Sequence, residues 1–228
     1  MDPLTYADIK EPFLRALNLD RRASYLIREI EAGRGTYEMA SEYAARVGDT
    51  LAKVLRRHAP LESIEEWDID TLIPQSLGLN HSIISYACEQ VQNEMNANAH
   101  LGIRYQAPTF DTDRAFGLVQ ELRDNPEFTN IEATFYDQLA NFSQNVVDEA
   151  IRDNAAIMER AGIRSKIIRT PEAGACSWCD DVAGTYDYEE VRNGGDVWRR
   201  HENCRCTINF VTERNSGIFS QVINNFRR

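Results

Sequence analysis

Four of the five cysteines of the chain lie between positions 176 and 206, together with one of its four histidines. The stretch has the pattern Cys176-x2-Cys179, then 21 residues, then His201-x2-Cys204-x-Cys206. Two cysteines separated by two residues in a tight turn can direct both thiolates at one ion, and zinc takes four nitrogen or sulfur ligands tetrahedrally. The spacing therefore predicts a structural zinc site held by Cys176, Cys179, His201 and one of Cys204 and Cys206.

The fourth ligand depends on where the following strand begins. If residues 206–211 form a strand, Cys206 shares the core-facing side with Ile208 and Phe210, because side chains alternate between the two faces of a strand. That arrangement favours Cys204 as the ligand, and a later start would leave either cysteine able to serve. Four protein ligands leave no open position for an activated water, so the expected role is structural and not catalytic.

The same clustering argues against a disulfide framework, because secreted frameworks spread even numbers of cysteines over short chains. The N-terminus lacks the basic and apolar segments of a secretory signal. No run of eighteen apolar residues is present, so no membrane partner is expected. The sequence therefore predicts a protein made in a cytoplasm, with reduced thiols available for a metal.

Charge is distributed unevenly along the chain. The net charge is −11, yet residues 191–228 contain seven arginines and three acidic residues, 7 − 3 = +4, which leaves about −15 elsewhere. An acidic body excludes a protein whose whole surface grips nucleic acid. The basic end can contact nucleic acid or an acidic partner, or can simply be solvated; the candidate contact residues are Arg199, Arg200, Arg205, Arg227 and Arg228.

Residues 1–126 are predicted to form a helical region, because apolar residues recur there at three- and four-residue steps, most clearly from Thr36 to Leu55. Asn80 is expected to cap another helix, and Asp111 or Thr112 to start a short one. Prolines such as Pro74 are expected to mark breaks between these helices.

The remaining segments complete an α+β prediction: a mainly helical N-terminal region with one long helix, followed by a small zinc-stapled module of short strands. One long helix is expected over 127–162, closed by Gly162 in a C-terminal turn. Residues 163–211 are expected to form the zinc-binding module, with strands at 165–170, 185–188 and 206–211. Residues 212–228 read as a short amphipathic helix or tail.

The module resembles the C-terminal domain of Mu F-like minor head proteins, the head-morphogenesis proteins of tailed bacteriophages. The resemblance is carried by Arg-Thr-Pro at 169–171, Cys-Ser-Trp-Cys at 176–179, Val-Ala-Gly-Thr-Tyr at 182–186 and His-Glu-Asn-Cys-Arg-Cys-Thr at 201–207. The HxNCRC element is its most specific part, and the resemblance is firm only over 167–211. The sequence departs from the family at 198–200, where Trp-Arg-Arg stands in place of the frequent prolines.

The resemblance implies a non-enzymatic structural protein in the virion, inside the phage head or at the portal vertex, made in the bacterial host cytoplasm. The implied partners are the portal protein, the major capsid protein and packaged DNA, with no small-molecule substrate. Two alternatives remain open. The basic tail beside the zinc segment suits a DNA-binding zinc module, and His201 with Asn203 suits a zinc-dependent nuclease, although His201 is better used as a zinc ligand.

Overall fold

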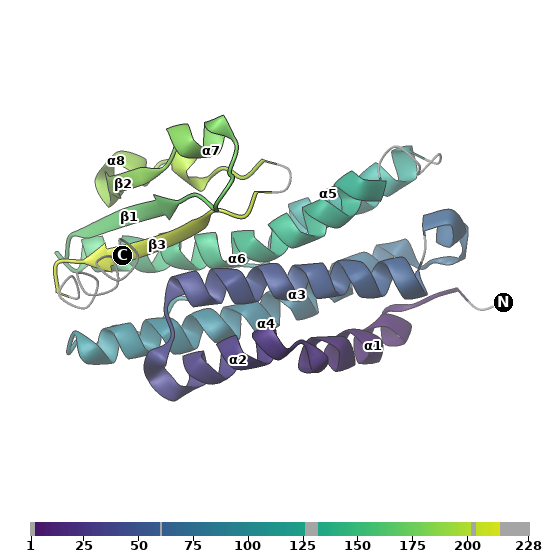
Figure 1. Ribbon diagram of the computed structural model, residues 1–228, viewed down its shortest axis with the longest axis horizontal. Coiled ribbons are helices and arrows are strands. Elements are labelled where there is room, and N and C mark those ends of the chain that lie inside the picture. Colours follow the sequence, from purple (N-terminus) through teal and green to yellow (C-terminus); the bar gives the residue numbers. More distant parts are fainter. Residues whose placement is uncertain (1–2, 60, 126–131, 202–203, 215–228) are drawn as a thin grey trace.

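The computed structural model describes residues 3–59, 61–125, 132–201 and 204–214. It is mostly helical, with one small antiparallel sheet near the C-terminus, so the α+β prediction is confirmed (Figure 1). The first residues of the expected long helix, and residues 215–228 of the expected C-terminal helix or tail with Arg227 and Arg228, lie outside the described residues, while Thr212 ends the last strand. None of the described helices is both long and apolar enough to span a membrane.

The elements, in chain order, are α1 (Tyr6–Leu19), α2 (Arg21–Glu29), the π-helical turn η1 (Ile30–Arg34), α3 (Tyr37–His58), the 3₁₀ turn η2 (Leu61–Glu66), α4 (Ile69–Asn98), α5 (Thr112–Asp124), α6 (Glu132–Arg160), β1 (Ser165–Thr170), α7 (Ser177–Asp181), β2 (Gly184–Asp187), α8 (Tyr188–Val191), the 3₁₀ turn η4 (Asp196–Trp198) and β3 (Thr207–Thr212).

The long helices α3, α4 and α6 pack against one another, and α1 and α2 lie along α3 and α4 (Figure 1). The expected start of α3 is confirmed, since the Thr36 side chain accepts a hydrogen bond from the Met39 backbone N–H and caps the helix. Helices α3 and α6 approach each other closely at Gly48 of α3. A Cβ atom there would lie 2.5 Å from the Ser143 Oγ and 2.7 Å from the Ala140 Cα, both on α6.

Two expectations about α4 were wrong. Asn80 does not begin a helix but lies fully buried inside α4, where its side-chain amide donates to the Ser143 Oγ at 2.9 Å. Pro74 also lies within α4 and not at a break. Proline removes one backbone hydrogen bond early in the helix, and the burial of Leu72, Ile73 and Leu77 around it offsets that loss.

An extended segment connects α4 to α5 and is tied to the long helices by asparagines. Asn154 of α6 accepts from the Gln106 N–H at 3.0 Å and donates to the Gln106 carbonyl at 2.9 Å. Asn96 donates to the Ile103 carbonyl at 2.8 Å. The expected start of α5 is confirmed, because the Asp111 side chain accepts from the Arg114 N–H and caps the helix.

The sheet has the order β2-β1-β3, with β1 antiparallel to both neighbours. Gly162 closes α6 with φ +76°, as expected, and leads the chain into β1. Strand β3 packs on α3 and α6, where Phe210 meets the Tyr37 ring at a centroid distance of 5.5 Å. The helices and the sheet therefore share one apolar core.

The strand limits differ from the expected ones by one residue. The second strand covers Gly184–Asp187, and the third begins at Thr207, so Cys206 lies just before it. The short helices α7 and α8 were not expected. The later start removes the alternation argument for the fourth ligand, and the choice between Cys204 and Cys206 must come from their surroundings.

Candidate metal centre

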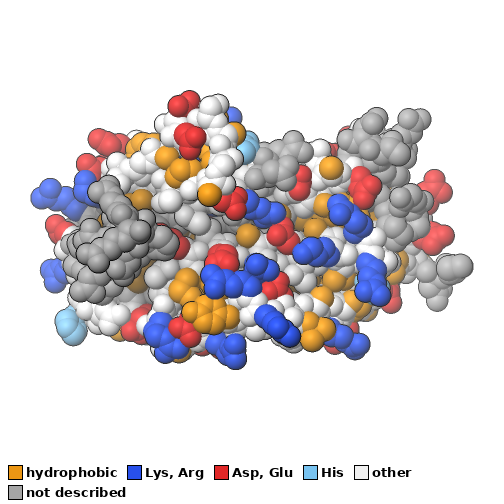
Figure 2. All heavy atoms as spheres, viewed as in Figure 1, with side chains coloured by type: hydrophobic (Ala, Val, Ile, Leu, Met, Phe, Trp, Pro, Cys, Tyr) orange, Lys and Arg blue, Asp and Glu red, His pale blue; other side chains and the backbone are white. Residues whose placement is uncertain are grey.

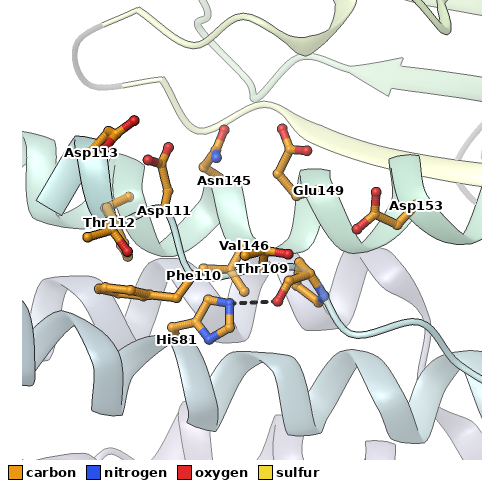
Figure 3. Close-up of a pocket in the computed structure, with 12 residues that line it drawn as sticks. His81, Thr109, Phe110, Asp111, Thr112, Asp113, Asn145, Val146, Glu149 and Asp153 are labelled. Carbon is orange, nitrogen blue, oxygen red and sulfur yellow. Dashed lines mark hydrogen bonds between the residues drawn. The ribbon is translucent and has the colours of Figure 1, made fainter.

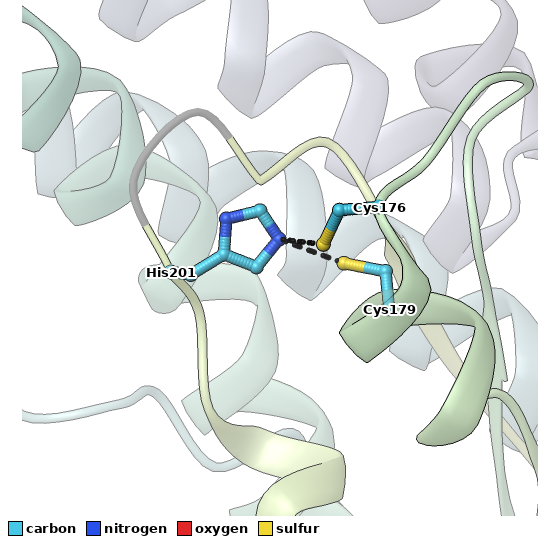
Figure 4. A group of neighbouring side chains, drawn as sticks. All are labelled: Cys176, Cys179 and His201. Atoms are coloured by element: carbon cyan, nitrogen blue, oxygen red, sulfur yellow. Dashed lines mark hydrogen bonds between the residues drawn. The ribbon is translucent and has the colours of Figure 1, made fainter.

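The cysteine and histidine side chains come together between α7 and the loop that leads to β3. Cys176 precedes α7 and Cys179 lies in its first turn, so the turn points both sulfur atoms the same way. The His201 Nε2 lies 3.3 Å from the Cys176 Sγ and 2.9 Å from the Cys179 Sγ (Figure 4). Three of the predicted ligands thus converge from segments more than twenty residues apart.

A second group of donors overlaps the first. The Sγ atoms of Cys179, Cys204 and Cys206 lie within 4.8 Å of one another, and all three side chains are buried. The Cys179 and Cys204 sulfur atoms are 3.9 Å apart. Ordinary zinc bond lengths give tetrahedral edges of about 3.7 Å between two sulfurs and about 3.5 Å between sulfur and nitrogen. The Cys179–Cys204 and Cys176–His201 separations are close to these values and the Cys179–His201 separation is shorter, so the cluster could hold a metal ion after a small adjustment of the His201 side chain.

A buried positive charge beside the cluster is a second observation that suits a bound metal ion with thiolate ligands. Arg169 of β1 is 2% exposed, and its Nη1 donates to the carbonyls of Val197 and Arg199, each at 2.7 Å. Its Nη2 lies 3.6 Å from the Cys204 Sγ. Within the described part of the chain, no carboxylate forms an ion pair with this guanidinium. A buried charge is costly unless it is compensated. Three thiolates around a divalent ion carry one net negative charge and would provide that compensation.

The surroundings distinguish Cys204 from Cys206. Two guanidiniums face the Cys204 sulfur, since the Arg200 Nη1 lies 3.9 Å from it in addition to Arg169. A hydrogen bond from Cys206, together with these charges, lowers the pKa of Cys204 below its ordinary value. The pKa of Cys206 is raised well above its ordinary value, first by its hydrogen bond with Cys204 and then by burial. Metal ligation needs a thiolate, and the two guanidiniums beside the Cys204 sulfur favour a thiolate there.

Trp178 and Trp198 contact different parts of the molecule. Trp178 meets the His201 ring edge-on at a centroid distance of 5.5 Å and also lies against the Arg169 guanidinium, as expected of a residue that covers the cluster. Trp198 does not cover the cluster. Its indole N–H donates to the Val191 carbonyl at 2.8 Å, and its ring packs against the main apolar core.

The described arginines that the sequence proposes as contact residues differ in their exposure and in their ion-pair partners. Arg199 is exposed and pairs with Asp196. Arg205 is partly buried and pairs with Asp49 of α3 at 2.7 Å. Arg200 is 3% exposed and is enclosed with Asp148 of α6. The sequence did not indicate that Arg169, Asp148 and Arg200 lie beside the cluster. The one hint was that Asp148 falls among the apolar residues of the buried face of α6, where a carboxylate needs a partner.

A separate cavity of about 510 Å³ lies between α6, α4 and the segment that leads into α5. In Figure 3 the carboxylates of Asp111, Glu149 and Asp153 point away from His81, which hydrogen-bonds to the Pro108 carbonyl. Burial lowers the pKa of His81 and raises the pKa of Glu149 and Asp153. No described contact joins the histidine to a carboxylate as an acid–base pair, and the cavity supplies no donor to the metal cluster.

Comparisons with protein-family models, with curated proteins and with solved structures found no match to this chain. The resemblance to Mu F-like proteins accordingly stays a prediction that depends on the residues of the cysteine–histidine segment.

Proposed function

We propose that this chain is a structural minor head protein of a tailed bacteriophage. In this proposal it associates with the portal vertex inside the phage head and acts in head assembly or in DNA packaging and ejection. A structural zinc ion held by Cys176, Cys179, His201 and Cys204 ties α7 to the loop that precedes β3. The chain performs no catalysis in this role, and its binding partners are the portal protein, with the major capsid protein and packaged DNA as further candidates.

One observation carries the proposal: the cysteines and the histidine of the Cys-x2-Cys and HxNCRC elements, which are the specific part of the resemblance, come together in two overlapping groups that share Cys179. Soft thiolates together with one imidazole suit zinc. Four protein ligands would saturate the ion, which favours a structural role over hydrolysis. The portal association comes from the resemblance alone.

The test is co-expression of the chain with the portal protein encoded in the same phage genome, followed by affinity capture of the portal. The proposal expects the chain to elute with the portal in a stable complex and to be retained in purified procapsids. Absence from both fractions, with the chain soluble and folded, would contradict it. A Cys176→Ser variant serves as a matched control for whether the zinc module takes part in the association.

The arrangement of charge disfavours the DNA-binding alternative. Arg200 is enclosed with Asp148, and Arg205 is engaged by Asp49. Residues 61–150 contain 16 acidic residues and 3 arginines, 3 − 16 = −13. Figure 2 shows Lys and Arg side chains over α1, α2 and α3 interspersed with acidic ones and not gathered into one basic patch. DNA affinity of a zinc module would fall steeply with salt, so binding that is absent at low salt would remove this alternative.

A further inference from the structure

One guanidinium touches three parts of the molecule that meet at the candidate metal centre. Arg200 directly precedes His201, and its Nε and Nη2 donate to the two carboxylate oxygens of Asp148 at 2.5 and 2.8 Å. Its Nη1 donates to the Cys206 carbonyl at 2.8 Å and lies 3.9 Å from the Cys204 Sγ. The side chain therefore joins helix α6, the backbone before β3 and a candidate ligand sulfur.

The Arg200–Asp148 ion pair is buried, and burial removes the hydration that stabilises both charges. The Arg200 and Asp148 side chains are 3% and 1% exposed. A buried pair of this kind often stabilises a protein no more than apolar residues of the same volume would. Asp148 lies on α6 between Val147 and Ile151, which are both buried, so an apolar side chain would fit the stripe. The position of the pair beside the Cys204 sulfur suggests a role other than packing.

Residues that contact metal ligands without binding the ion themselves affect metal affinity. Groups that hydrogen-bond to ligands fix ligand orientation, and their loss typically weakens metal affinity 10- to 100-fold. The two-pronged contact with Asp148 fixes the plane of the Arg200 guanidinium, because a carboxylate matches two of its N–H groups. With that plane fixed, Nη1 is directed at both the Cys206 carbonyl and the Cys204 sulfur.

We propose that the Asp148–Arg200 pair is an outer part of the metal centre. Asp148 orients Arg200, and Arg200 holds Cys204 in the ligating position while its bond to the Cys206 carbonyl fixes the backbone that follows Cys204. Asp148 and Arg200 are positioning residues in this account, which rests on the proposed zinc centre. Helix α6 thereby contributes to how tightly the metal is held.

The test compares the zinc affinity of the full chain with that of Asp148→Asn, by competition against a chromophoric chelator under reducing conditions. Asparagine keeps the size of the side chain and removes the charge. The inference expects affinity at least about 10-fold weaker, and a shifted ligand-field spectrum when cobalt replaces zinc. The matched control is Asp187→Asn, which removes an exposed ion pair with Lys166 in the same module and should change neither readout.

A second variant protects the test against misfolding. Arg200→Lys keeps the positive charge but cannot make the two-pronged contact, so it should show an intermediate loss of affinity. Unchanged affinity and an unchanged cobalt spectrum in a folded variant would overturn the inference, even if the variant melted at a lower temperature. Failure of the wild type to bind zinc or cobalt would instead overturn the proposed zinc centre, so the two failures are distinguishable.

Discussion

At the scale of single residues, burial changes the acid–base behaviour of side chains next to the metal module. Glu149 lies one residue after Asp148 and lines the cavity beside α6. Burial raises its pKa above the ordinary value of 4.5, and Arg152 only partly opposes that rise. The ionised carboxylate is consequently less favourable in the folded protein than in the unfolded chain.

We expect Glu149→Gln to raise the free energy of unfolding at pH 7. A carboxyl whose folded-state pKa is raised binds its proton at a higher pH in the folded protein than in the unfolded chain. The wild type therefore gains stability relative to the variant as pH falls through the raised pKa toward 4.5, and the difference should vanish below that value. Urea unfolding from pH 7.5 to 4 measures this. Glu89→Gln, at an exposed position on α4, is the control; an advantage of Glu149→Gln that persists below pH 4.5 would contradict the account.

Spacing was enough to predict which cysteine and histidine side chains come together, but the residues that contact them were not predictable from sequence. A Cys-x2-Cys turn brings its own two sulfurs together locally, so Cys176 and Cys179 follow directly from the sequence. Arg169 and Asp148 are brought to the cluster by the sheet and by α6, and no local rule connects them to positions 201–206. Arg200 looked like part of a solvated basic tail because the arginine count carried no information about burial.

At the scale of elements, the helical layer depends on how closely α3 approaches α6. Gly48 allows this contact because it has no Cβ. The neighbouring Ser143 also receives the buried Asn80 amide, so α3, α4 and α6 meet at one point.

We expect Gly48→Ala to destabilise the protein by about 1–3 kcal/mol, the usual cost of overpacking a close contact. The added methyl would meet the Ala140 backbone at 2.7 Å, and a backbone cannot rotate away. Gly78→Ala in α4 is the matched control. No atom lies within 4 Å of its added Cβ, and it should stabilise by up to about 1 kcal/mol through helix propensity. Chemical denaturation gives both values, and equal effects would refute the close crossing.

Elements with strong periodicity or clear caps were predicted well, and those that depend on packing were not. The starts of α3 and α5 follow from the capping residues Thr36 and Asp111. The continuity of α4 through Pro74 and Asn80 was missed, because the tertiary burial of neighbouring residues overrides a local break signal.

At the scale of the whole molecule, the sheet and the helices are joined through a common core. Ile167, Ile208 and Phe210 of the sheet belong to the same buried cluster as the residues of α3, α4 and α6. The sequence suggested separate units at 1–126, 127–162 and 163–211, and the shared core connects the described parts of all three.

We expect metal removal to lower the stability of the whole molecule in one cooperative transition. Binding to the folded state alone adds about 2.7 kcal/mol when free metal is 100-fold above its dissociation constant. Thermal melts with and without chelator should be followed by circular dichroism, which reports the helices, and by fluorescence, to which Trp178 and Trp198 of the module contribute. Coincident midpoints are expected for both probes. An early fluorescence transition with unchanged helix melting would show an independent module.

Elemental analysis of the dialysed, reduced protein, beside its Cys176→Ser and Cys206→Ser variants, measures directly whether the chain holds zinc and through which cysteines. The account predicts about one zinc per chain in the wild type and in Cys206→Ser, because tetrahedral zinc takes four ligands and Cys206 is the fifth candidate. It predicts loss of zinc in Cys176→Ser. A wild type without zinc would contradict the metal centre, and loss in Cys206→Ser with retention in Cys176→Ser would contradict the ligand assignment.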